Sequence, residues 1–435
     1  MAYLLRGATL ITLDPPDIQQ ADLRIDAGRI VERGTQLSER GADEVINLSG
    51  KFILPGLVCA HTHLYSALAR GMPAPPRTPA NFKEILELIW WRLDRALDEE
   101  TIYWSALAGA LDAARTGTTC IYDHHASPTH IRGSLGIVRE AIERVGLRAV
   151  LCYEVTDRGG REQRDDGINE NRAFLEWTRC QPETSQFRAL VGAHASFTLT
   201  DSALQVCAEL MRAYGTGLHI HVAEDLCDVE DARSKYGMGI LERLSRLKAL
   251  NEQTIIAHGT HLQRLEINIG REAGVWFAHN PRSNMNNQVG YAPVADFGAR
   301  LLLGTDGIGA DMFEEARFAF LKGRDERLSF GAEQWLRVLA NNQRRASQEF
   351  GIDLLGLAPG SAADLIVLDY PCPTPLSPGN LPWHLVFGMS SAQVESVMVA
   401  GRFVVRNRQP TLDVTSVAGQ TRKASEKLWA KIQEL

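Results

Sequence analysis

Two histidines that follow an apolar run are the first sign of chemistry in this 435-residue chain. His61 and His63 come directly after ILPGLVCA. Residues two apart on a β-strand point to the same side, about 6.6 Å apart along it, so both imidazoles can reach one ion. His221 ends a later strand candidate, and Asp306 ends another. Three neutral imidazoles and a carboxylate suit one divalent ion, Zn²⁺ first and Fe²⁺ second, with a position left for water.

A carboxylate and a further histidine follow these predicted ligands in the sequence. Glu224 comes three residues after His221, so the turn after that strand can bring its carboxylate back over the ion. A divalent ion lowers the pKa of bound water toward 7, and burial raises the pKa of a catalytic carboxylate. We therefore predict Glu224 as the proton shuttle, His258 as a hydrogen-bond partner of the nucleophile, and Asp306 as a second proton relay.

Other histidines and one aspartate at strand ends leave alternatives open. His219 faces the same way as His221 and competes with it for the ion. The cluster formed by residues 123–125, which reads Asp123, His124 and His125, could belong to the site or only hold a loop. His279 could likewise only brace its loop.

The composition of the chain excludes several other classes of function. Hydrophobic residues make up 45% and charged residues 23%, which is typical of a globular protein. A net charge of −7 argues against a nucleic-acid partner and favours a small-molecule substrate. The seven cysteines form no CxxC pair, so we expect reduced thiols and a metal site of nitrogen and oxygen ligands. Neither a secretory signal nor a run of about 18 apolar residues is evident, so we expect a cytoplasmic protein without membrane contact.

Eight short apolar stretches between residues 57 and 357 alternate with amphipathic helical stretches, as in βα units around a parallel sheet. In a (β/α)₈ barrel the carboxyl ends of the strands meet on one face, where the catalytic residues lie. The reactive side chains stand at such ends, so we predict an α/β fold with a (β/α)₈ TIM-like barrel. The predicted strands are GLVCAHTH, TTCIYDHH, RAVLCYEV, FRALVGAHAS, GLHIHVAE, TIIAHG, VWFAHN and RLLLGTD.

The two ends of the chain read as short strands and tight turns that could pair in one sheet. We therefore divide the chain into residues 1–56 and 358–412 as the two parts of a small β module, 57–357 as the barrel, and 413–435 as a terminal helix. An insertion near residues 72–91 holds four prolines and then FKEILELIWW, which predicts a rigid and then helical cover over the site.

The motifs AHTHLYSALARGM, HVAED, IIAHG, HNPRSN and LLLGTDG resemble those of the amidohydrolase superfamily, in the branch of the cytosine, guanine and S-adenosylhomocysteine deaminases and the triazine hydrolases. WWRLDRALDEE, DHHASP, SNMNN and LGTDGIGADMFEE are similar to SsnA-type aminohydrolases. The likeness covers nearly the whole chain. It implies a barrel plus a β-sandwich built from both chain ends, hydrolysis of a C–N bond, and a homodimer or larger homo-oligomer. It also implies the metal ligands and catalytic residues named above.

The resemblance also bears on the residues left open. The spacing to Glu224, as in the family, favours His221 as the ligand and leaves His219 deeper in the core. The family positions imply substrate binding by His194 and Glu84. FRALVGAHAS lacks the lysine that is carbamylated in binuclear members, so we expect one metal ion. Arg282 departs from the usual seventh-strand motif and suggests contact with an oxygen-rich or anionic substrate edge.

The function predicted from these residues is hydrolytic deamination of a nitrogen heterocycle such as a purine, pterin or pyrimidine. Ring opening of a cyclic amide or amidine, as in purine catabolism, and hydrolytic dehalogenation of a triazine use the same metal site and are the enzymatic alternatives. A catalytically inactive barrel that serves as a binding scaffold is the non-enzymatic one. Release of ammonia separates deamination from ring opening, which retains the nitrogen.

Overall fold

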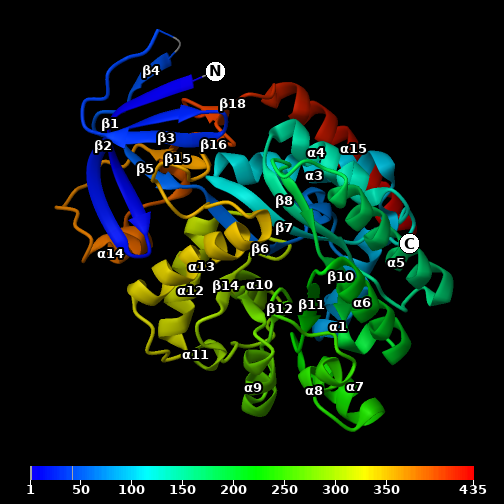
Figure 1. The fold of residues 1–435 in the computed structure, drawn as a ribbon. Helices are drawn as coiled ribbons and strands as arrows, with labels where there is room; N and C mark the ends of the chain where they lie inside the picture. Colours follow the sequence, from blue (N-terminus) through cyan, green and yellow to red (C-terminus); the bar gives the residue numbers. More distant parts are fainter. Residues whose placement is uncertain (1, 42) are drawn as a thin grey trace.

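Two parallel sheets and one larger mixed sheet form the framework of the chain (Figure 1). The computed structural model describes residues 2–41 and 43–435. The strands are β1 Ala2–Leu13, β2 Pro16–Asp26, β3 Arg29–Gly34, β4 Asp43–Asn47, β5 Phe52–Pro55, β6 Leu57–Thr62, β7 Thr118–His125, β8 Arg148–Tyr153, β9 Phe187–Ala189, β10 Val191–Ala195, β11 Leu218–Val222, β12 Ile255–His258, β13 Trp276–His279, β14 Leu301–Leu303, β15 Leu365–Leu368, β16 Val394–Val399, β17 Arg402–Arg406 and β18 Gln409–Pro410.

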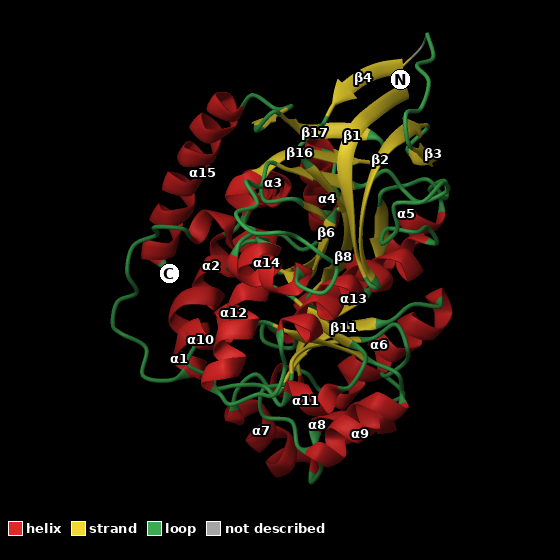
Figure 2. Cartoon of the chain, turned by 90° about the vertical axis from the view of Figure 1, so that its left-hand side faces the viewer, coloured by secondary structure: helices red, strands yellow, loops and turns green. Residues whose placement is uncertain are grey.

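Helices lie on both sides of the parallel strands, so the fold is of the mixed α/β class (Figure 2). The α-helices are α1 Phe82–Ile85, α2 Trp91–Ala96, α3 Glu99–Arg115, α4 Ser134–Val145, α5 Gly160–Arg179, α6 Asp201–Tyr214, α7 Leu226–Tyr236, α8 Ile240–Arg246, α9 Arg264–Glu272, α10 Pro281–Asn286, α11 Val294–Phe297, α12 Met312–Asp325, α13 Ala332–Phe350, α14 Leu381–Phe387 and α15 Val414–Glu434.

The eight strands predicted for the middle of the chain are all present. They form a four-stranded sheet, β6-β7-β8-β9, and a five-stranded sheet, β10-β11-β12-β13-β14. The fourth predicted strand is interrupted at Leu190, so it supplies the edge strands β9 and β10 of the two sheets. Single parallel bridges join the sheets on both sides, between Thr62 and Asp306 and between Val155 and Ala193.

Alternate residues of these strands enter different hydrophobic clusters. Residues such as Leu57, Cys59 and Ile121 belong to the large cluster that includes the helices. Their neighbours in sequence form a second, smaller cluster that draws on both parallel sheets. The two faces of a strand point in opposite directions, so the second cluster lies between the two sheets. Its strand residues are Val58, Ala60, Cys120, Tyr122, Val150, Cys152, Ile255, Trp276, Ala278 and Leu302.

The two chain ends meet in a third sheet, as the sequence predicts. Its nine strands follow the order β18-β17-β16-β15-β5-β1-β2-β3, with β4 paired to β1. The junction between the ends is the antiparallel pair β5–β15, in which Ile53 lies opposite Val367. Because β5 continues directly into β6, this sheet holds the strand that carries the histidine pair.

The insertion after β6 forms a cover of the predicted kind. A segment without regular structure leads to α1, a π-helix over Leu86–Trp90, and α2. The C-terminal helix α15, which is also as predicted, braces the polypeptide after β6, because Trp429 Nε1 donates a hydrogen bond of 2.8 Å to the carbonyl of Leu68. The β5–β15 pair before β6 and the contact with α15 after it therefore hold this strand at both ends.

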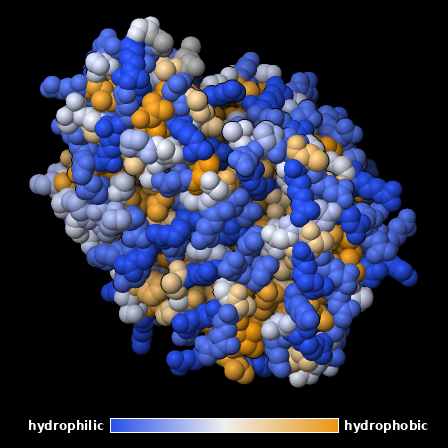
Figure 3. Space-filling view, in the orientation of Figure 1, coloured by the Kyte–Doolittle hydropathy of each residue, from blue (hydrophilic) through white to orange (hydrophobic). Residues whose placement is uncertain are grey.

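The surface is mainly hydrophilic on the face drawn in Figure 3, with hydrophobic side chains in small separate groups. Across residues 2–41 and 43–435, no helix has the length and apolar character needed to span a bilayer.

Candidate metal centre

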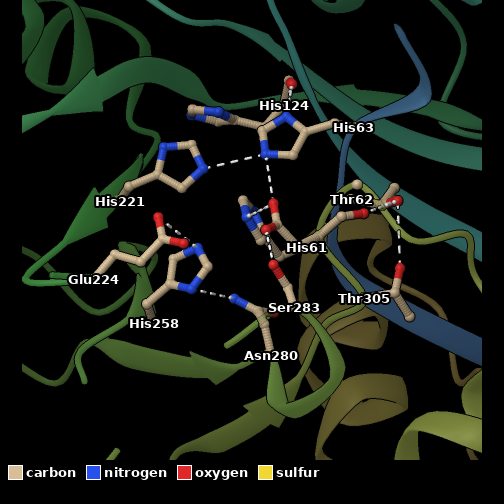
Figure 4. A network of polar contacts seen from close by, with 12 residues as sticks. His61, Thr62, His63, His124, His221, Glu224, His258, Asn280, Ser283 and Thr305 are labelled. Carbon is tan, nitrogen blue, oxygen red and sulfur yellow. Dashed lines mark hydrogen bonds and ion pairs between the residues drawn. The ribbon is translucent and has the colours of Figure 1, made fainter. Parts of the chain in front are cut away.

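The three histidines predicted as metal ligands lie together at the strand ends (Figure 4). Asp306, the fourth predicted ligand, lies beside them. His63 Nε2 is 3.1 Å from His221 Nε2 and 2.9 Å from Asp306 Oδ1. His61 Nε2 lies 3.4 Å from the same carboxylate oxygen. His61 lies on β6 and His221 on β11, whereas His63 and Asp306 follow β6 and β14, so three strands bring four donor atoms to one point.

The hydrogen bonds behind the imidazoles fix which nitrogen faces this point. His63 Nδ1 donates to the carbonyl of His124 at 2.5 Å, and His221 Nδ1 donates to the carbonyl of His194 at 2.9 Å. In the neutral rings each of the two facing Nε2 atoms then carries a lone pair, and the two nitrogens lie 3.1 Å apart. Two lone pairs at that distance repel each other unless a cation lies between them. The donor set therefore fits a divalent metal ion, or a proton in its place.

His219, the rival ligand, lies behind His61. Its Nε2 is 2.9 Å from His61 Nδ1, and its carbonyl accepts a hydrogen bond from His124 Nε2 at 2.9 Å. His61 Nε2 has no hydrogen-bond partner among the described residues. The deeper position expected for His219 is therefore the one observed, and it orients His61.

The protonation of this cluster follows from burial and from Asp306. Burial lowers the pKa of His61 to about 3. Burial also lowers the pKa of His63, but the hydrogen bond and negative charge of Asp306 outweigh it and raise that pKa to about 9. Burial raises the pKa of Asp306, but the adjacent imidazoles of His61 and His63 outweigh it and hold that pKa well below its usual range. A carboxylate and a cation are thus stable here together.

Glu224 and His258 stand beside the cluster, as predicted from their spacing. Ala223 adopts φ 48°, and this left-handed turn after β11 directs Glu224 back over the strand end. Glu224 Oε2 lies 3.6 Å from His258 Nε2 (Figure 4). Burial raises the pKa of Glu224 to about 7. His258 and Asp306 also have positive φ, 69° and 51°, and such strain in residues other than glycine is common at functional sites.

Helix α10 and the residue after it supply three orienting side chains that the sequence analysis missed. Asn284 Oδ1 accepts a hydrogen bond from His258 Nδ1 at 2.8 Å, and Asn287 Nδ2 donates to Glu224 Oε1 at 3.1 Å. Ser283 Oγ donates to Asp306 Oδ2. The SNMNN motif that carries them was visible, but its spacing does not show that the side chains face the strand ends.

Two side chains expected to bind substrate point elsewhere. Arg282 pairs with Glu314 and Glu315 of α12 and donates to the carbonyl of Gly309 at 2.7 Å, so its charge is used within the protein. Glu84 pairs with Arg77 and accepts a hydrogen bond from Ala80 N at 2.7 Å. Neither residue lines the cavity over the metal centre. Substrate contact by Glu84 and Arg282 is therefore not supported by their positions.

The residues whose roles were left open are buried around the cluster. Asp123 Oδ1 accepts from Leu64 N at 2.6 Å, which fixes the turn after the histidine pair. His124 Nδ1 is 2.8 Å from Glu154 Oε1, and His125 Nε2 is 3.0 Å from Ser127 Oγ. His279 packs against Trp335, with ring centroids 6.1 Å apart.

A cavity of about 680 Å³, open solvent included, lies over the centre. The cover contributes aromatic and aliphatic side chains, Trp90 and Trp91 among them. His194, which the resemblance implies as a substrate-binding residue, also lines the cavity. The lining residues are His63, Tyr65, Ser66, Phe82, Leu86, Trp90, Trp91, Asp94, Glu154, His194, Ala195, Phe197, His221, Glu224, Asp225, Asp228, Asn287, Asp306 and Gly307.

Comparison with known proteins relates this arrangement to a family. The profile described as "Amidohydrolase family" matches residues 52–404. The 5'-deoxyadenosine deaminase of Methanopyrus kandleri is 32% identical over 408 residues, 90% of each chain. The 5-methylthioadenosine/S-adenosylhomocysteine deaminase of Thermococcus sibiricus is 30% identical over 412 residues, 93% of this chain and 94% of its own. The zinc-bound structure of an adenosine deaminase from Xanthomonas campestris superposes with a TM-score of 0.86 at 21% identity, covering 98% of each chain.

Proposed function

Because this chain belongs to the amidohydrolase family, we propose that it is a metal-dependent aminohydrolase that removes an amino group from a nitrogen heterocycle. The reaction replaces a C–NH₂ bond with a C–O bond and releases ammonia, with water as the co-substrate. The observation that carries the proposal is Glu224 beside His258 at the edge of the His/Asp cluster, on the floor of the cavity. A proton shuttle at that point has no use in a binding scaffold.

We infer that the two parallel sheets are one (β/α)₈ barrel. The bridges on both sides and the hydrophobic cluster shared by the two sheets support this inference. Residues 57–357 then form the barrel, and 1–56 and 358–412 form the β-sandwich, with 413–435 as a terminal helix. A homodimer in the cytoplasm remains the prediction drawn from the sequence.

The residues proposed to hold the ion are His61, His63, His221 and Asp306. Their converging Nε2 and carboxylate atoms support one divalent ion, and zinc is the ion proposed, since the donor set is nitrogen and oxygen. When bound, such an ion lowers the pKa of a water molecule and so supplies the nucleophile. His219 and the carbonyls of His124 and His194 orient the three rings for this purpose.

Glu224 is the proposed proton shuttle. With a pKa of about 7, its carboxylate can accept a proton from water and deliver it to a ring nitrogen at neutral pH. Asn287 fixes one of its oxygens and leaves the other near His258 Nε2. Asn284 accepts from His258 Nδ1, which leaves His258 Nε2 unprotonated in the neutral ring and able to accept from the nucleophile. Asp306 is the proposed relay to the leaving ammonia.

The experiment that tests this proposal is ammonia release by the zinc-loaded protein. Aminated purines, pterins and pyrimidines are offered, together with 5'-deoxyadenosine and S-adenosylhomocysteine, and ammonia and ring absorbance are followed together. Deamination releases one ammonia per ring converted. Loss of ring absorbance without ammonia would replace the proposal with ring opening. A protein that binds no metal ion and turns over none of the panel would favour the scaffold.

A further inference from the structure

Glu154, just after β8, has a buried carboxylate whose two oxygens face different surroundings. The residue is 3% exposed. Oε1 lies 2.8 Å from His124 Nδ1, and His124 Nε2 in turn donates to the carbonyl of His219. His124 thus fixes the Oε1 side of the Glu154 carboxylate. Glu154 lines the cavity, and its other oxygen, Oε2, is 3.9 Å from His194 Nε2, which is too far for a hydrogen bond.

His194 presents a second hydrogen-bond acceptor beside this carboxylate. The hydroxyl of Thr198 donates to the carbonyl of Ala195 at 3.0 Å, so it accepts from His194 Nδ1 at 2.8 Å. His194 Nδ1 therefore carries a proton. In the neutral ring His194 Nε2 has a lone pair, and it lies beside Glu154 Oε2.

Asp94 adds a third acceptor to the same side of the cavity. Its Oδ2 accepts from Arg158 at 2.7 Å. Its Oδ1 is buried and has no hydrogen-bond partner within the described part of the chain. Buried polar atoms are almost always paired in proteins, so this acceptor is expected to meet a donor on a ligand or on a water molecule.

Glu154 and Glu224 stand on opposite sides of His221. Glu224 is next to His258, which lies on β12. Glu154 follows β8 and His194 lies on β10, on the other side of β11. In the proposed deamination, Glu224 faces the ring nitrogen beside the amino-bearing carbon. The ring edge on the far side of that carbon then faces Glu154 and His194.

We propose that Glu154 is a specificity-determining residue that selects heterocycles with an N–H donor on this second ring edge. The proposal rests on the proposed function and names its substrate class. In adenine that edge carries N7, which is an acceptor. A carboxylate and an imidazole lone pair cannot pair with it. An oxo group at C8 turns N7 into an N–H, which both acceptors can bind. We therefore infer that the substrate is a purine-type amine oxidised next to this nitrogen, or a heterocycle with the same donor pattern.

The test is equilibrium binding and turnover of two matched pairs by the zinc-loaded protein. The pairs are adenine with 8-oxoadenine, and adenosine with 8-oxoadenosine. Isothermal titration gives Kd and ammonia release gives kcat/KM. We expect the 8-oxo member to bind about 10- to 100-fold more tightly, because the other member leaves buried acceptors unpaired. Equal binding within both pairs, or tighter binding of the N7 acceptor, overturns the proposal.

Glu154→Met removes both acceptor oxygens and keeps a side chain of similar length. Residue 154 then has no group that can pair with an N–H of the ring. We expect the preference to fall at least about tenfold. Glu170→Met is the matched control, because Glu170 is a buried carboxylate that accepts from Gly133 N and Leu135 N and does not line the cavity. The control should keep the wild-type preference.

The two proposals fail in distinguishable ways. Tighter binding of the 8-oxo members without ammonia release would sustain the role of Glu154 and refute deamination. Ammonia release from both members at equal efficiency would sustain deamination and refute the role of Glu154. A Glu154→Met variant that binds a full zinc equivalent and keeps the wild-type preference would also refute it.

Discussion

The two walls of the cavity are built differently although both rest on the same strand ends. The catalytic wall, Glu224 and His258, is aimed by left-handed backbone at Ala223 and His258 and by two amides from α10 and the residue after it. The recognition wall, Glu154 and His194, continues from ordinary strands and is held by side chains from neighbouring strands and turns. The catalytic wall depends on left-handed backbone at two residues, whereas the recognition wall depends only on which side chains stand at its positions. Specificity can therefore change without disturbing the chemistry.

Glu224→Gln is expected to give the largest effect and tests the catalytic wall alone. The variant should keep a full equivalent of zinc, because Glu224 is not in the proposed ligand set. Turnover should fall by about 100- to 10,000-fold on every substrate, since a proton shuttle acts on all of them. Steady-state kinetics and metal analysis measure both. A variant with more than a tenth of the wild-type kcat would remove Glu224 from the mechanism.

Asn284→Ala weakens the catalytic wall without removing a catalytic group. His258 loses the acceptor that fixes its tautomer, so kcat should fall by about 10- to 100-fold with little change in substrate preference. Met285→Ala, at a half-buried position of the same helix that does not line the cavity, is the control. An equal loss in both variants would indicate damage to α10 as a whole.

The pH dependence of zinc binding tests the protonation state of His63, a ligand in the metal centre between the two walls. In the metal-free protein the pKa of His63 is about 9, above its unfolded value of about 6.5. Protonated His63 therefore stabilises the metal-free fold fully below pH about 6.5, and this contribution is lost as the pH rises through about 9.

Zinc must displace that proton. Its apparent affinity for the metal-free protein should rise about tenfold per pH unit between 7 and 9 and then level off. Competition with a chromophoric chelator measures this affinity. Activity should vanish on chelation and return with zinc at the same occupancy. An affinity that does not change from pH 7 to 9 would show that His63 is already neutral.

The negative charge of the cavity lining gives the smallest predicted effect, which is a lower kcat/KM for a phosphorylated substrate. Six carboxylates line it and, among the residues that the structure describes there, no lysine or arginine does. Like charges about 4 Å apart repel by about 1 kcal/mol in water and about 4 kcal/mol near a protein surface. A nucleoside 5'-monophosphate should therefore have a kcat/KM at least about tenfold lower than its nucleoside, and added salt should narrow the gap. Equal values would place the phosphate outside the cavity. This expectation replaces the anionic substrate edge inferred from Arg282, whose charge Glu314 and Glu315 already neutralise.

Some features followed from the sequence because they depend on local periodicity and spacing. Alternating apolar strands and helices predict parallel strands, and each of the eight is present. His61 and His63 share a side because residues two apart on a strand do so. The position of Glu224 followed in the same way, since only a turn separates it from His221.

Other features depended on which segments meet in space. Arg282, Ser283 and Asn284 are consecutive, and a helix sends consecutive side chains in directions about 100° apart. Only the packing of α10 decides that Ser283 and Asn284 face the strand ends while Arg282 faces α12. Nothing in the spacing of the sequence singles out Glu154. Its surroundings come from His124 on the neighbouring strand β7 and His194 on β10, which the fold places on its two oxygens' sides.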